Sequence, residues 1–143
     1  MSSAISIVPS SKIWSMVLIF ELLVGCVSNT DKEALKPESE TKDAKAQYNL
    51  GAMYSNGRDG ARDYAEALEW FRKAAQQGDP DAQYNLCVAY RQGNEVSQDS
   101  VEAYKWCILA GSKASQIRMS MARTLSPKQM AEAEDRVAQF RAK

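Results

Sequence analysis

Apolar residues recur with a helical period along the second two-thirds of the chain. Leu50 and Tyr54 are four residues apart, and Ala67, Trp70 and Ala74 follow at spacings of three and four residues. Such spacings place each set on one face of a helix and leave polar residues on the opposite face. The pattern therefore predicts two amphipathic helices in succession.

Residues typical of helix ends bracket both predicted helices. Asp43 precedes the first helix as an N-cap, and Gly57 follows it as a stop signal. Asp63 begins the second helix, with Glu66 three residues later in the spacing of a capping box, and Gly78 ends it. The unit is therefore expected to be a pair of antiparallel helices.

The same unit recurs 36 residues later, because Ala-Gln-Tyr-Asn-Leu at 46–50 returns at 82–86. The offset also relates Asp43 to Asp79, Tyr54 to Tyr90, Gly57 to Gly93, Asp63 to Asp99, Glu66 to Glu102, Trp70 to Trp106 and Ala74 to Ala110. We expect two repeats, at 43–78 and 79–111, with Pro80 opening the second copy and Gly111 ending it. A helix pair of this kind buries its apolar stripe only by stacking on a neighbour.

Residues 112–143 form a degenerate third unit. Ile117 and Met121 share a face of a short helix, and Ser126-Pro127 followed by Gln129 forms a capping box with proline at the first helical position. The last helix carries one apolar stripe, made of Met130, Ala133, Val137 and Phe140. The predicted fold is thus all-α: a short α-solenoid of antiparallel helix pairs, with two clear repeats and a C-terminal capping pair.

The repeated residues resemble a known family. A-Q-Y-N-L-G-x-x-Y at 46–54 and D-Y-A-E-A-x-x-W-F at 63–71 look like Sel-one-like repeats, a variant of tetratricopeptide repeats with a longer loop between the helices. The resemblance covers about 43–143 and departs from the family's G-x-G-V loop, where Asp59-Gly60 and Glu95-Val96 stand instead. It implies a binding scaffold whose first helices line a groove.

The N-terminal segment predicts export and lipid anchoring. A short apolar run ends at Leu23-Val24-Gly25-Cys26, which resembles the lipobox of bacterial lipoproteins. That resemblance implies a signal peptide at 1–25, a diacylated (palmitate-bearing) Cys26, and a polar tether at 26–42. By resemblance to enteric lipoproteins, Val27 after the cysteine, where aspartate is absent, favours the outer membrane, with the domain facing the periplasm. The alternative is an ordinary signal peptide or anchor with a chance cysteine.

Composition narrows the range of chemistry. Eighteen basic residues balance eighteen acidic ones, so no charge footprint favours nucleic acid, and the membrane is expected to be contacted only through the lipid anchor. The chain has no histidine and no C-x-x-C pair, so we expect no metal site, no cofactor and no enzymatic activity. One S-x-x-K, Ser39 to Lys42, falls in the predicted tether, and neither of the S-D-N and K-T-G motifs of penicillin-recognising enzymes follows it.

The candidate binding groove is expected on the first helix of each repeat. Its residues by this alignment are Tyr48, Ala52, Ser55, Asn56, Tyr84, Val88, Arg91 and Gln92. Trp70 and Trp106 fall on the stripes of the second helices, which favours core packing over a ligand site. Asn49 and Asn85 resemble the asparagine that holds a peptide carboxylate in some tetratricopeptide domains; the alternative is that they tie adjacent repeats together. Lys45 and Arg91 supply only part of the basic partners of such a clamp.

The two remaining cysteines, Cys87 and Cys107, align by the 36-residue offset with Gly51 and Phe71. One repeat thus pairs a tiny residue with a large one, and the other pairs two of middling size, as volume conservation at touching positions would require. An oxidising compartment favours a disulfide. The alternative is two free thiols packed as small hydrophobic side chains.

These features favour a non-catalytic module that binds an unidentified protein, peptide or glycan in the cell envelope. Two alternatives stay open at this stage: a penicillin-binding or hydrolytic enzyme on the same fold, and a passive structural component of the envelope.

Overall fold

A computed structural model describes residues 43–57 and 61–143, and every regular element in these residues is helical. The elements are α3 (Ala44–Asn56), α4 (Tyr64–Gln76), α5 (Pro80–Gln92), α6 (Ser100–Leu109), the 3₁₀ turn η1 (Gly111–Ala114), α7 (Ser115–Ala122) and α8 (Pro127–Arg141). The all-α prediction is confirmed. The predicted signal peptide, lipidated Cys26, tether and S-x-x-K lie outside the described residues.

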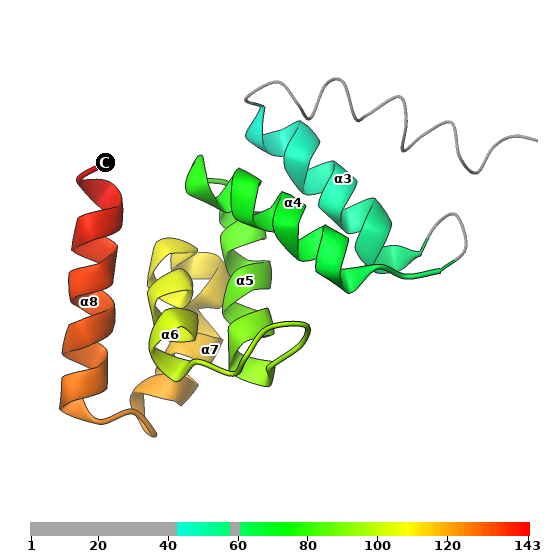
Figure 1. The fold of residues 1–143 in the computed structure, drawn as a ribbon. Helices are drawn as coiled ribbons and strands as arrows, with labels where there is room; N and C mark the ends of the chain where they lie inside the picture. Colours follow the sequence, from blue (N-terminus) through cyan, green and yellow to red (C-terminus); the bar gives the residue numbers. More distant parts are fainter. Residues whose placement is uncertain (1–42, 58–60) are drawn as a thin grey trace, which may run out of the picture.

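The helices stack in chain order as pairs (Figure 1). α3 packs against α4, α5 packs against both α4 and α6, and α8 covers the far side of α6. Each pair leaves an apolar stripe that the next element buries, which is the arrangement expected of a short solenoid. No helix of the described part combines the length and apolar character needed to cross a membrane.

Aspartate side chains cap the helices at the predicted positions. Asp43 Oδ1 accepts from the Lys45 amide, and Asp79 Oδ1 accepts from the Ala82 amide, 2.9 and 2.8 Å away. Gly57 and Gly93 follow α3 and α5 with φ angles of 64° and 73°, the left-handed conformation that ends a helix and suits glycine.

The two predicted Asp-x-x-Glu capping boxes are only half formed, so that prediction was wrong in its second half. Asp63 accepts from the Glu66 amide at 3.0 Å, and Asp99 does the same for Glu102. The return bonds do not form because the Asp63 amide donates to the Tyr54 carbonyl, 3.0 Å away, and the Asp99 amide donates to the Tyr90 carbonyl, 3.1 Å away. The full box predicted between Ser126 and Gln129 is present.

A continuous apolar core runs through the stack. Leu50 and Leu86, equivalent residues of the two first helices, are fully buried. Trp70 and Trp106 are each only 5% exposed, which agrees with their assignment to the core. The core is therefore built from the same repeat positions twice.

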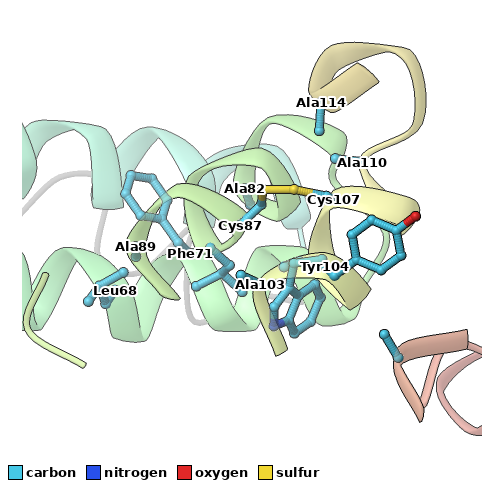
Figure 2. Close-up of a cluster of buried hydrophobic side chains, with 14 of the residues drawn as sticks. Leu68, Phe71, Ala82, Cys87, Ala89, Ala103, Tyr104, Cys107, Ala110 and Ala114 are labelled. Atoms are coloured by element: carbon cyan, nitrogen blue, oxygen red, sulfur yellow. A yellow bond between two sulfur atoms is a disulfide. The ribbon is translucent and has the colours of Figure 1, made fainter. Parts of the chain in front are cut away.

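Cys87 and Cys107 join α5 to α6 at the centre of the second repeat (Figure 2). Their Sγ atoms form a disulfide and their Cα atoms lie 5.2 Å apart, a separation that suits such a bond. In the first repeat the equivalent positions also touch, because a Cβ built on Gly51 would lie 2.8 Å from the Phe71 ring. Oxidation of the pair in the cell stays a prediction.

Helix α8 closes the C-terminal end of the stack. Ala133 and Val137 lie on its buried face, whereas its exposed residues are Glu134, Asp135, Gln139 and Arg141. Arg136 Nη1 bonds Glu102 Oε2 on α6 at 2.9 Å, and Arg136 Nη2 bonds Glu132 Oε1 at 2.8 Å. The buried stripe and the Arg136–Glu102 bond hold α8 on α6, and the exposed polar residues face outward, as expected of the C-terminal capping pair.

Candidate functional site

An open pocket of about 160 Å³ lies where α3, α4 and α5 meet. Its lining residues come from both repeats and are Ser55, Tyr64, Leu68, Phe71, Asn85, Val88, Ala89 and Asn94. The pocket is therefore a product of stacking, since neither helix pair forms it alone.

Two helix stripes form the pocket walls. Tyr64, Leu68 and Phe71 are spaced by four and three residues and so share one face of α4. Leu68 and Phe71 are buried, whereas Tyr64, the first residue of the helix, is 46% exposed. Val88 and Ala89 of α5 complete the apolar surface. The result is an apolar floor with a tyrosine on its rim.

The polar groups of the pocket are neutral. Ser55 Oγ donates to the Ala52 carbonyl at 2.9 Å, and Asn94 Nδ2 donates to Gln92 Oε1 at 2.7 Å. Asn85 is half-buried, and its side-chain amide has no hydrogen-bond partner among the described residues. An amide offers both a donor and an acceptor, which matches the needs of a peptide group in a ligand.

The pocket contains only part of the groove predicted from the sequence. Ser55 and Val88 line it, and the other predicted groove residues do not: Tyr48, Ala52, Asn56, Tyr84, Arg91 and Gln92. The Tyr48 ring instead packs on Phe71, with ring centroids 5.6 Å apart, so part of its surface is used in holding α3 to α4.

Sequence reasoning missed the contribution of α4 to the pocket. The groove was expected on first helices only, yet Tyr64, Leu68 and Phe71 come from a second helix. A signal for them exists in the sequence, because the same four-and-three spacing continues to an aromatic residue at the exposed helix start. Asn94 lies in the turn after α5, where no periodic pattern could have indicated it.

The basic residues considered for a carboxylate clamp do not line the pocket. Lys45 at the start of α3 lies 3.6 Å from Asp81, and its Nζ is 4.7 Å from the Tyr48 ring centroid. Asp81 also binds Lys113, and this hydrogen bond holds the pKa of the Asp81 carboxyl below its usual value. Lys45 and Asp81 therefore link successive repeats, and a carboxylate clamp is not assembled.

The described residues contain no group of three or more His, Cys, Asp or Glu side chains placed to hold a metal ion. The pocket presents amides, a hydroxyl, a phenol and apolar carbon, none of which is aligned as a nucleophile with a base. Its chemistry is suited to binding an uncharged, partly apolar group.

The helix pairs and the inter-repeat pocket define the class of an α-solenoid repeat protein. The family model of the Sel1 repeat matches residues 44–79 and 80–115, so the chain belongs to the Sel1 repeat family. The second match extends beyond 79–111, the span expected from the sequence, and takes in η1. Repeats of this family typically mediate protein–protein interaction and generally act as non-catalytic scaffolds.

Similar proteins come from bacteria. The secretory immunoglobulin A-binding protein EsiB of Escherichia coli O6:H1, strain CFT073, is 40% identical over 48 residues, which are 34% of this chain and 10% of that protein. The crystal structure of c5321, a protective antigen present in uropathogenic Escherichia coli strains and displaying an SLR fold, superposes with a TM-score of 0.70 at 26% identity, over 90% of this chain and 29% of that one.

A Sel1 repeat protein from Oxalobacter formigenes superposes with a TM-score of 0.54 at 36% identity, over 61% of this chain and 37% of that chain. The chain thus spans between a tenth and just over a third of the length of these three proteins. They support the fold and the family.

Proposed function

We propose that this protein is a non-catalytic binding module that takes an extended peptide segment of a partner protein into the pocket between its two repeats. It does so while anchored through lipid on Cys26 in the outer membrane, with the repeats facing the periplasm. The partner is a protein or peptide; a glycan is the less favoured ligand because the pocket floor is apolar.

The unpartnered amide of Asn85 above an apolar floor carries this proposal. The Asn85 amide is half-buried and not among the fully buried polar atoms, so it stays open to water, and the peptide group of a ligand offers the donor and the acceptor that replace this water. The pocket volume of about 160 Å³ lies below the range of about 300–1,000 Å³ that is usual for small-molecule sites. It is the right order of size for one apolar side chain of a longer ligand.

The family and one relative support the class of partner. Sel1 repeats typically serve protein–protein interaction, and the relative EsiB carries an immunoglobulin-binding function in its name. That relative is far longer than this chain, so the argument extends only to a protein ligand and not to an immunoglobulin.

Site-specific photo-cross-linking tests the proposal in a bacterium that produces the full chain. A benzophenone amino acid replaces Asn94 on the pocket rim in one variant and exposed Glu134 on α8 in a matched control. We expect a discrete adduct of one partner protein from position 94 and none from position 134. Equal adducts from both positions, or none from position 94, would contradict the proposal and favour a passive structural role.

A further inference from the structure

A second open pocket, of about 320 Å³, adjoins the first. It is lined by Tyr64, Gly93, Asn94 and Glu95, and so shares Tyr64 and Asn94 with the apolar pocket. One pocket is walled largely by apolar side chains and the other carries a carboxylate. A ligand that passes over Tyr64 therefore meets an apolar surface on one side and an acidic one on the other.

Glu95 adopts a backbone conformation that L-residues avoid. Its φ angle is 54°, and it is the one non-glycine residue with positive φ in the described part of the chain. A non-glycine residue in this region costs free energy, and residues held in this way concentrate at functional sites. Glycine at position 95 would remove that cost, so the conformation of the turn does not account for the glutamate found there.

The Glu95 carboxylate is exposed and makes no ion pair or hydrogen bond with a described residue. Tyr64, which is 46% exposed at the start of α4, lines the same pocket. The face of an exposed aromatic ring attracts a cation, and a carboxylate lining the same pocket adds to that attraction, so the two together favour a positively charged group. Arg91, at the end of α5, lines neither pocket.

We infer that the partner segment carries a lysine or arginine close to its apolar anchor residue, with the cation held between Glu95 and Tyr64 while the apolar side chain fills the pocket over Leu68 and Phe71. This inference rests on the proposed function and adds the sequence chemistry of the ligand. An acidic segment is selected against, because its charge would face an uncompensated carboxylate.

Selection from a phage library of random 12-residue peptides on the full chain is the test. We expect the enriched peptides to combine a basic residue with an apolar residue within about three positions. For a synthetic peptide of this kind, Glu95→Gln should raise Kd about fivefold, the effect of losing one exposed charge pair. Glu95→Lys should shift the selection towards acidic peptides, whereas Glu134→Gln on α8 should change neither result.

A peptide-side control keeps the test independent of folding. Replacing the basic residue of the selected peptide with glutamine should weaken binding to the natural chain at least about fivefold and weaken binding to Glu95→Gln much less, since only the attraction to the Tyr64 ring is lost there. If peptides are enriched without basic residues, and Val88→Arg abolishes their binding while Glu95→Gln does not affect it, the inference is wrong and the proposed function stands. If no peptide is enriched at all, both are wrong.

Discussion

The two equivalent tryptophans have different hydrogen-bonding environments, which predicts unequal responses to the same substitution. Trp70 Nε1 donates to Glu66 Oε1 at 2.9 Å. Trp106 Nε1 is buried and has no partner within the described residues, because Glu102, the equivalent of Glu66, is bound to Lys105 and Arg136 instead. We therefore expect Trp70→Phe to destabilise the fold much more than Trp106→Phe.

The expected difference in unfolding free energy follows from the different surroundings of Trp70 and Trp106. Both rings are 5% exposed and both have a lysine over one face. Trp106 also packs edge-on against Phe140, with centroids 5.5 Å apart, an arrangement that a phenylalanine ring forms as well, so the loss of ring volume should cost a similar amount at each. Trp70→Phe also loses a half-buried hydrogen bond worth about 1 kcal/mol, whereas Trp106→Phe removes a desolvated N–H that costs about 1–3 kcal/mol. The free energies of unfolding of the two variants should differ by about 2–4 kcal/mol.

Urea unfolding followed by far-UV circular dichroism measures this difference, since the helical backbone dominates the signal in both variants. The unfolding slopes should match, which shows that the two variants expose similar surface. If Trp106→Phe costs as much as Trp70→Phe, the capture of Glu102 by Arg136 is not the reason for the unpartnered N–H, and the role given to α8 is wrong.

Three further substitutions or treatments have defined outcomes. Gly51→Ala should lower the free energy of unfolding by about 1–3 kcal/mol because the new Cβ meets the Phe71 ring; an unchanged melting temperature would contradict this contact. Alkylation in denaturant without reductant should leave Cys87 and Cys107, both buried in the fold, unmodified, and reduction should cost about 3 kcal/mol of stability; two alkylated cysteines would mean free thiols. A fatty-acid analogue should label the natural chain and not Cys26→Ser; equal labelling of both would exclude the anchor.

The periodic part of the structure could be predicted because the same pattern of residues occurs twice in the chain, once in each repeat. Helix order, the aspartate caps, the glycine stops at Gly57 and Gly93, and the burial of Trp70 and Trp106 all follow from spacing and recurrence. The contact between positions 51 and 71 could also be predicted from the sequence. The first repeat has glycine and phenylalanine at these positions, and the second has two cysteines of intermediate size. At these positions the helix-forming tendency of the residues and their place in the 36-residue repeat favour the same structure, so few other folds fit the sequence.

The candidate site was harder to predict because it depends on relations between repeats. Tyr64 lies at a helix start, and its place on the rim follows only from how α4 packs on α5. Glu95 occupies the loop where the sequence departs from the family pattern, and its positive φ leaves no periodic trace. Glu102 matches Glu66 in sequence but binds Arg136, a partner from outside the repeat.

A nuclear magnetic resonance titration tests the central claim most directly. The ¹⁵N-labelled full chain is titrated with a peptide selected from the random library. Binding between the repeats predicts the largest shifts at the side-chain amide groups of Asn85 and Asn94 and at the backbone amides of Ser55, Tyr64 and Val88. Shifts concentrated on α8, or around Lys45 and Asp81, would contradict the assignment of the pocket as the binding site.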